Sequence, residues 1–227
     1  MARKGIFITG TDTGVGKTYL GVQLIAALYE LGIKAVPRKP VESGCHRVNG
    51  TLVPEDAQQY FEAASRTFSL EAVCPFRFEP AISPQRAARL AGRPVYLEDL
   101  ASSCLSETSS DDFLVVEGAG GFYSPLCEDG LNSDLAKILE LPVLLVAQDK
   151  LGCINHVLLT IEAICGQGLS TCSVILSQQE ALGDEAMNNS EDLTALLDVP
   201  VFSISCHEKM DLTSGKTLSI LQAIRHP

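Results

Sequence analysis

The sequence contains no apolar run long enough to cross a bilayer, no C-x-x-C pair and no surplus of basic residues. A membrane-spanning helix needs roughly 18 apolar residues in a row. The N-terminal apolar run stops at Thr9, which is also too short for a secretory signal. Eight scattered cysteines are therefore expected to stay reduced in the cytoplasm, and the four histidines show no zinc-ligand spacing beside them. A formal net charge of −11 argues against a nucleic-acid partner.

Short apolar segments alternate with helical patterns, which predicts a doubly wound α/β fold with a mainly parallel sheet flanked by helices. No internal repeat interrupts the chain, so residues 1–227 are predicted to form a single domain. The predicted strands are Gly5–Thr9, Ile33–Val36, Phe113–Glu117, Val143–Ala147, Ser173–Leu176 and Val201–Ile204. The predicted helices are Tyr19–Leu31, Glu55–Ser65, Pro84–Ala91, Leu97–Glu107, Ser133–Glu140, Cys153–Cys165, Glu191–Leu197 and Gly215–Ala223. The polar residues 178–190 are predicted to form a surface loop.

A glycine-rich segment, GTDTGVGKT at residues 10–18, lies between a predicted strand and a predicted helix. Small residues let backbone N–H groups point at an anion, and the helix N-terminus adds partial positive charge. Lys17 can then reach the β- and γ-phosphates of a nucleotide, and the Thr18 hydroxyl can ligate Mg²⁺. The spacing departs from the plain G-x-x-x-x-G-K-[ST] pattern, which would place glycine where Thr11 stands. Ordinary turns also use glycine and threonine, but the strand and helix on either side favour nucleoside polyphosphate binding.

Polar residues also follow other predicted strands, at the edge where the carboxyl ends of parallel strands meet. Glu117 ends an apolar strand beside a glycine turn, where it either binds a cation such as Mg²⁺ or caps the turn. Lys39 either neutralises charge during phosphoryl transfer or is simply solvated. Asp56 is explained equally well by the dipole of a helix that begins there. The turn at residues 152–155 opens a helix whose N–H groups either bind an anion or only carry a cap.

Four blocks occur in order along the chain: GTDTGVGKT at 10–18, KPVESG at 39–44, VEGAGG at 116–121 and KLGCINH at 150–156. Together they resemble the dethiobiotin synthetase family, as do Ser83-Pro84 and Gly92-Arg93-Pro94. The resemblance implies a P-loop NTPase-like fold and an ATP- and Mg²⁺-dependent cyclo-ligase of biotin biosynthesis. Such enzymes use CO₂ to close a cyclic urea on 7,8-diaminononanoate (7,8-diaminopelargonate) through a carbamate and a carbamic–phosphoric anhydride. They are homodimers with sites built across the subunit interface.

The resemblance also implies roles for individual residues. Lys39 and Lys17 would be catalytic, and Thr13 and Ser43 would contact the diamine substrate. Thr18, Asp56 and Glu117 would ligate Mg²⁺. The phosphates and the rest of the nucleotide would be bound by Gly14, Val15, Gly16, Lys17, Thr18, Tyr19, Gly118, Ala119 and Gly120. The substrate's tail carboxylate, bound mainly by the other subunit, would be held by Gly152, Cys153, Ile154 and Asn155.

The chain departs from the family where the nucleotide base is read. The family usually places Asn-Asp after the strand that ends at Leu176, whereas this chain has Ser177-Gln178. Further on, Cys206, His207 and Glu208 stand where the family tends to show an Ile-Pro pair. A serine hydroxyl cannot replace the paired donor and acceptor of an asparagine amide. The protein is therefore expected either to accept nucleoside triphosphates besides ATP or to read the base through backbone groups.

Two other functions remain as alternatives from the sequence. Related ATPases dimerise on membranes or DNA to position cargo, but they carry a lysine where Asp12 stands, and no amphipathic membrane helix is visible here. A non-catalytic homologue that only binds nucleotide is opposed by the presence of Lys17, Thr18, Lys39 and Glu117.

Overall fold

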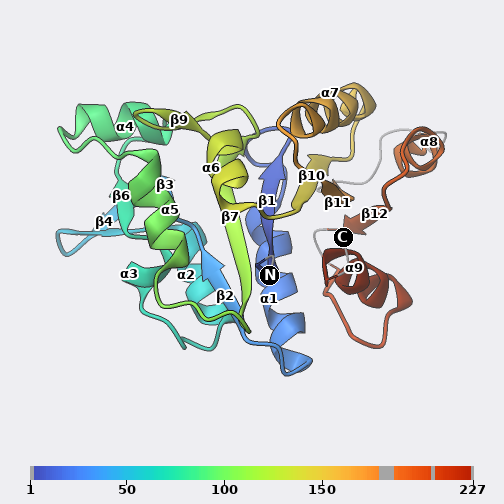
Figure 1. The fold of residues 1–227 in the computed structure, drawn as a ribbon, viewed down its shortest axis with the longest axis horizontal. Coiled ribbons are helices and arrows are strands. Elements are labelled where there is room, and N and C mark those ends of the chain that lie inside the picture. The colour runs from blue at the N-terminus through green and yellow to red at the C-terminus, as the bar shows by residue number, and fades with distance from the viewer. Residues whose placement is uncertain (1–2, 179–186, 206–207, 226–227) are drawn as a thin grey trace.

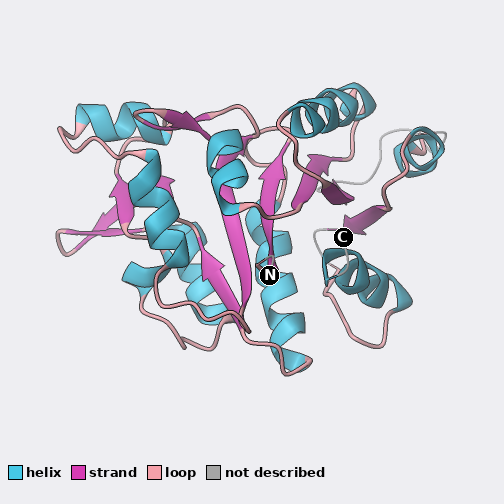
Figure 2. Ribbon diagram, viewed as in Figure 1, coloured by secondary structure: helices cyan, strands magenta, loops and turns pink. Residues whose placement is uncertain are grey.

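Six parallel strands form the central sheet of the computed structural model, which describes residues 3–178, 187–205 and 208–225. The strand order is β12-β11-β10-β1-β7-β2 (Figures 1 and 2). The bounds are β1 Gly5–Gly10, β2 Ala35–Arg38, β7 Phe113–Gly121, β10 Val143–Gln148, β11 Thr171–Gln178 and β12 Val201–Ser205. Every neighbouring pair is parallel, which confirms the predicted fold class.

Helices cover both faces of this sheet. They are α1 Lys17–Glu30, α2 Glu55–Ala63, α3 Leu70–Val73, α4 Pro84–Leu90, α5 Leu97–Leu105, α6 Asn132–Leu139, α7 Cys153–Gly166, α8 Asn189–Leu196 and α9 Gly215–Arg225. On β10, Val146 belongs to the core cluster that contains Ile220 of α9. The adjacent Leu145 joins a second cluster with Val157 of α7 and Leu193 of α8. Because successive strand residues face opposite sides, α7 and α8 cover one face and α9 the other. In the described parts of the chain, no helix is both long and apolar enough to cross a membrane.

Several short strands were not predicted. β3 (Val41–Ser43) pairs in parallel with β6 (Phe76–Phe78). Two antiparallel ribbons pair β4 (His46–Val48) with β5 (Thr51–Val53), and β8 (Pro125–Cys127) with β9 (Gly130–Leu131). Segments of two or three residues are too short to show the alternation that identifies a strand.

The glycine turn predicted after Glu117 is wrong. β7 continues through Gly118 to Gly121, so Glu117 lies within the strand rather than at its end. The pairing of β7 with β1 shifts register after Ile8, and Gly121 then pairs with Gly10. Glycine also suits this stretch because Gly120 has a φ of 80°, in the left-handed region.

Several predicted boundaries also change. β2 begins at Ala35 rather than Ile33, and α1 begins at Lys17 rather than Tyr19. The predicted loop at 178–190 is wrong at both ends, because Gln178 belongs to β11 and α8 begins at Asn189. Residues 179–186 of that loop lie outside the described residues. The ends of β11 and α8 were missed because both consist of polar residues, and a polar composition favours a loop over a strand or a helix end.

Candidate active site

The phosphate loop connects β1 to α1. Gly14 and Gly16 have φ values of 73° and 100°, a region that glycine enters without strain. Gly16 is the N-cap of α1, so the N–H groups of the first helical turn point toward the loop. The Lys17 ammonium donates to the Asp12 carbonyl oxygen at 2.9 Å. Burial lowers the pKa of Lys17, while the charge of Glu117 opposes that shift. The loop therefore has a backbone cradle and a partly desolvated cation beside it.

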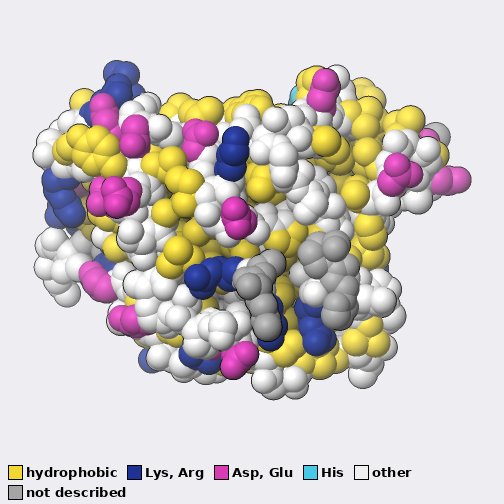
Figure 3. All heavy atoms as spheres, viewed as in Figure 1, with side chains coloured by type: hydrophobic (Ala, Val, Ile, Leu, Met, Phe, Trp, Pro, Cys, Tyr) yellow, Lys and Arg dark blue, Asp and Glu magenta, His cyan; other side chains and the backbone are white. Residues whose placement is uncertain are grey.

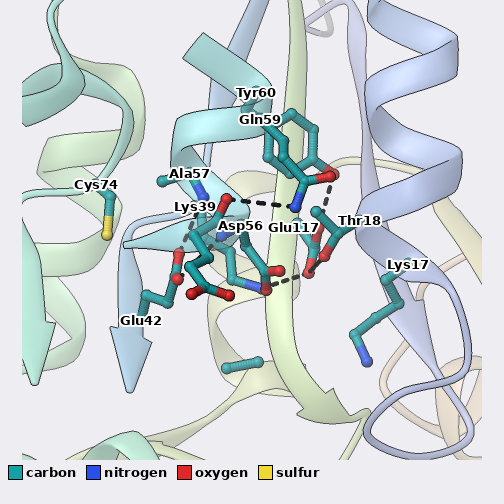
Figure 4. A network of polar contacts seen from close by, with 12 residues as sticks. Lys17, Thr18, Lys39, Glu42, Asp56, Ala57, Gln59, Tyr60, Cys74 and Glu117 are labelled. Carbon is teal, nitrogen blue, oxygen red and sulfur yellow. Dashed lines mark hydrogen bonds and ion pairs between the residues drawn. The ribbon is translucent and has the colours of Figure 1, made fainter. Parts of the chain in front are cut away.

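Lys39 lies in a cluster of oxygen atoms beside this loop (Figure 4). Its ammonium donates to Asp56 Oδ2 at 2.8 Å and forms a very short contact with Glu117 Oε1. Thr18 Oγ1 donates to the same Glu117 oxygen at 3.1 Å. Tyr60 of α2 donates its hydroxyl to the other oxygen, Glu117 Oε2, at 2.7 Å. Four segments distant in the sequence thus meet around one buried carboxylate.

The charges of this cluster compensate one another. Lys39 is 3% exposed and Glu117 is 1% exposed, so an unpaired charge at either position would be costly. Burial alone would lower the pKa of Lys39, but the charges of Glu117 and Asp56 outweigh it and raise that pKa. Burial alone would raise the pKa of Asp56, but Lys39 lowers it. The pair of Lys39 and Asp56 is therefore ionised at neutral pH.

Glu42 is a buried carboxylate that the sequence analysis did not single out. Its oxygens accept hydrogen bonds from the Asp56 and Ala57 N–H groups at 3.1 and 3.0 Å, at the start of α2. Burial raises the pKa of Glu42, partly offset by Lys39. The carboxylate thereby fixes the first turn of α2 and, with it, the backbone of Asp56. The sequence offered one signal for this role, because Glu42 is an acidic residue inside the block that begins at Lys39.

A cleft of about 640 Å³ opens over the loop and the cluster. Its lining includes most of the predicted site residues: Thr13, Gly14, Gly16, Lys17, Thr18, Tyr19, Lys39, Ser43, Asp56, Glu117, Ala119 and Gly120. It also includes Glu42, Ala81, Ile82, Ser83, Pro84, Ser124 and Pro125. Of these, the sequence analysis noted only the pair Ser83-Pro84 and, as part of the block at 39–44, Glu42. The cleft thus brings together three segments of the sequence. They are the phosphate loop after β1, the residues that follow β2 and the glycine-rich end of β7.

Several predicted residues lie outside this cleft lining. Val15 is buried in the core, and Gly118 packs against Asn132, whose Oδ1 would lie 2.4 Å from a Cβ at Gly118. Gly152, the N-cap of α7, has a φ of 90° and begins a turn that does not line the cleft. The same holds for Cys153, Ile154 and Asn155 in the first turn of α7.

The residues predicted near the base have partners within the protein. Ser177 is buried, and its Oγ would lie 2.7 Å from a Cβ at Gly16, so it packs under the phosphate loop. The Gln178 amide donates to Asp149 Oδ2 at 3.1 Å. The Glu208 carbonyl oxygen accepts the Tyr19 hydroxyl at 2.6 Å. Cys206 and His207 lie outside the described residues.

The oxygen donors of the cluster suit one kind of metal. Within residues 3–178, 187–205 and 208–225, no group of three or more His, Cys, Asp or Glu side chains is arranged to hold a metal ion. The cluster instead offers two carboxylates, Asp56 and Glu117, and the Thr18 hydroxyl. Mg²⁺ binds through one or two carboxylates together with water and substrate phosphates. The donor set therefore fits the Mg²⁺ ion of a nucleotide.

Comparison with known proteins identifies the class first. The family model for an AAA domain matches residues 4–206. This match, the parallel sheet and the glycine loop at the start of α1 define a P-loop nucleotide-binding protein.

Similarity to individual proteins is more specific. The ATP-dependent dethiobiotin synthetase BioD of Ruthia magnifica is 41% identical, and the match covers 77% of this chain and 80% of the relative. The protein of the same name from Anaeromyxobacter dehalogenans strain 2CP-1 is 42% identical, with 77% of each chain covered. This chain belongs to the ATP-dependent dethiobiotin synthetase family.

Solved structures show similarity of fold alone. MinD in the MinC:MinD complex of Aquifex aeolicus has a TM-score of 0.59 at 16% identity, covering 98% of this chain and 94% of that one. MinD of Pyrococcus horikoshii OT3, solved with Mg-ADP, has a TM-score of 0.57 at 17% identity, covering 99% and 95%. These two structures share the sheet and its flanking helices with this chain, and at this identity nothing further follows.

Proposed function

We propose that this protein converts 7,8-diaminononanoate, CO₂ and ATP into dethiobiotin, ADP and phosphate. The observation that carries the proposal is the single cleft in which the phosphate loop meets Lys39, Asp56 and Glu117. Membership of the dethiobiotin synthetase family supports the choice of reaction among those that such a cleft can perform. The fold by itself hosts many other activities.

The nucleotide phosphates lie against the loop in this proposal. Backbone N–H groups of residues 14–19 bind the phosphate oxygens, and Lys17 leaves the Asp12 carbonyl to pair with the β- and γ-phosphates. Thr18, Asp56 and Glu117 hold the Mg²⁺ ion, which neutralises phosphate charge when it is bound. Ala119 and Gly120, which line the cleft, border the rest of the nucleotide.

Lys39 is placed to assist the transfer step. One amine of the diamine combines with CO₂ to give a carbamate and a proton. A carbamate oxygen attacks the γ-phosphorus and ADP leaves, which forms a carbamic–phosphoric anhydride. The second amine then attacks the anhydride carbon and loses a proton, and phosphate leaves as the ring closes. Because no step needs a protein nucleophile, Lys39 and Lys17 act by neutralising charge on the transferred phosphoryl group.

The diamine is proposed to lie along Thr13 and Ser43, on the open side of Lys39. Its tail carboxylate is proposed to bind the N-terminus of α7, at Gly152–Asn155, from a second copy of the chain. That turn does not line the cleft of its own chain, which supports a site shared between two subunits. Exposed hydrophobic side chains in and beside α7, including Leu151 and Leu159, suit such an interface. Figure 3 shows hydrophobic side chains gathered around α7 on this face.

The base pocket is proposed to be weakly selective. Ser177 is packed under the phosphate loop and the Gln178 amide is bound to Asp149, so neither presents an amide pair to adenine. Cys206, His207 and Glu208 complete the proposed base-binding segment. Nucleoside triphosphates other than ATP are therefore expected to support turnover, which a comparison of ATP, CTP and GTP tests.

The direct test is to incubate the purified protein with 7,8-diaminononanoate, bicarbonate, Mg²⁺ and ATP and to detect dethiobiotin by mass spectrometry. We expect product that disappears when any of the four components is omitted. Product with another triphosphate but not with ATP would support the proposed reaction and would replace ATP as its proposed co-substrate. No product with any triphosphate, from protein shown to be folded by circular dichroism, would favour a non-catalytic homologue.

A further inference from the structure

Tyr60 contacts the cluster from the hydrophobic core and is not among the residues that line the cleft. It lies in α2, is fully buried and donates its hydroxyl to Glu117 Oε2 at 2.7 Å. The other oxygen, Glu117 Oε1, accepts from Thr18 and Lys39. Figure 4 shows the Tyr60 hydroxyl pointing at the Glu117 carboxylate. The two oxygens of Glu117 therefore have separate sets of donors.

Gly21 makes this contact possible. It lies inside α1, where glycine is less favourable than alanine. A Cβ atom at Gly21 would lie 1.8 Å from the Tyr60 hydroxyl oxygen and 2.6 Å from ring carbon Cζ. Because those atoms belong to a rigid ring, even a methyl group would force Tyr60 away from Glu117. The glycine thus allows the ring to lie directly against α1.

We propose that Gly21 and Tyr60 form a positioning pair that fixes the orientation of the Glu117 carboxylate. The terminal torsion of a glutamate is soft, so rotation of the carboxylate would otherwise redistribute its oxygens between Thr18, Lys39 and a metal ion. The Tyr60 hydroxyl holds Oε2 on the helix side and leaves Oε1 directed at the cleft. This inference rests on the proposed function in one respect, namely that Glu117 contributes to a Mg²⁺ site.

The test compares Mg²⁺ binding in the presence of ADP, by isothermal titration calorimetry, for the wild-type protein and Tyr60→Phe. Phenylalanine keeps the ring and removes the hydroxyl. We expect Mg²⁺ affinity to fall about 10- to 100-fold, the usual effect of losing a group that orients a metal ligand. Binding of ADP without Mg²⁺ should change less than about twofold, since the phosphate loop is untouched. Unchanged Mg²⁺ affinity would overturn the proposal.

Tyr29 provides a matched control in α1. Its buried hydroxyl has no hydrogen-bond partner in the described part of the chain. Tyr29→Phe removes the same atom as Tyr60→Phe. Because the Tyr29 hydroxyl does not bond to Glu117, Mg²⁺ affinity should stay within about twofold of wild type. An equal loss of affinity in both variants would show a general effect of hydroxyl removal and would contradict positioning by Tyr60.

A second pair of variants separates positioning from packing. Gly21→Ala should displace Tyr60, lower the melting temperature and weaken Mg²⁺ binding to a similar extent as Tyr60→Phe. Gly21→Ala combined with Tyr60→Leu removes the clash, so the melting temperature should recover while Mg²⁺ affinity stays low. Recovery of both would assign a packing role alone and overturn the proposal.

If the wild-type protein makes dethiobiotin yet binds no Mg²⁺ with ADP, the positioning inference fails while the proposed reaction stands.

Discussion

The two halves of the sheet differ in what they bury. Every buried charged side chain among residues 3–178, 187–205 and 208–225 belongs to the half around β1, β7 and β2: Lys17, Arg38, Lys39, Glu42, Asp112 and Glu117. In the half around β10 and β11, the second core cluster contains hydrocarbon and thiol side chains such as Leu145, Val174 and Leu193. Since a buried charge persists only with partners, the first half is organised around its ion pairs. The second half buries apolar side chains and a few neutral polar ones, such as Asn189, which donates to Asp149 Oδ1 at 2.7 Å.

This difference predicts that substitutions in the two halves affect different properties. The largest effect is expected for Lys39→Ala, in the charged half. Turnover should fall at least about 100-fold, because charge on the transferred phosphoryl group loses a neutralising partner. The free energy of unfolding should also fall by about 3 to 5 kcal/mol, because Glu117 is left buried without its ion-pair partner. Initial rates of dethiobiotin formation and urea denaturation measure the two losses.

Lys39→Arg is the matched control for that variant. It retains a cation beside Glu117 but moves the donor atoms, so most of the stability should return without the rate. A near-normal rate in Lys39→Ala would remove Lys39 from the catalytic residues and weaken the contrast between the two halves.

A smaller and purely structural effect is expected for Leu193→Ala, in the apolar half. Leu193 is fully buried in α8, and truncation of such a leucine costs about 2 to 5 kcal/mol of unfolding free energy. The dissociation constant for ATP should stay within about twofold of wild type, because no part of α8 lines the cleft. Urea denaturation and calorimetric ATP titration provide the measurements. A large loss of ATP affinity in folded protein would show that the halves are coupled.

The smallest effect is expected from changing the base of the nucleotide. Ser177 packs against the phosphate loop and the Gln178 amide is hydrogen-bonded to Asp149. Rates with CTP and GTP should therefore lie within about tenfold of the rate with ATP, a difference in activation free energy of about 1.4 kcal/mol or less. Initial rates at matched triphosphate concentrations decide the matter. A preference for ATP of several hundredfold would mean that other groups read the base.

The sequence predicted those parts of the fold and site that depend on local patterns. β1, the phosphate loop and α1 follow from an apolar run, a glycine-rich segment and a helical repeat that are adjacent in the chain. Helix α7 and its glycine N-cap at Gly152 follow in the same way. The extension of β7 to Gly121 was missed because glycines after an apolar strand read equally well as a turn.

The contacts that organise the cluster could not be predicted, because they join residues distant in the sequence. Tyr60 at helical spacing reads as an ordinary core residue, and its role appears only when Glu117, 57 positions later, is placed beside it. Glu42 likewise gains its role from the N-terminus of α2, 14 positions later. Gly21 reads as a weak point in a helix until the ring that packs against it is known.

The position of β1 in the sheet has a consequence for the order of folding during synthesis. β1 is synthesised before β7 and β10, yet it lies between them in the sheet. The contacts of α1 are completed later still, because Tyr19 bonds to Glu208 and Gln23 bonds to Met210. Contacts of such long sequence separation form late. β1 therefore stays without a neighbouring strand of the sheet until β7 has been made, and the contacts of Tyr19 and Gln23 can form only after Met210 has been synthesised.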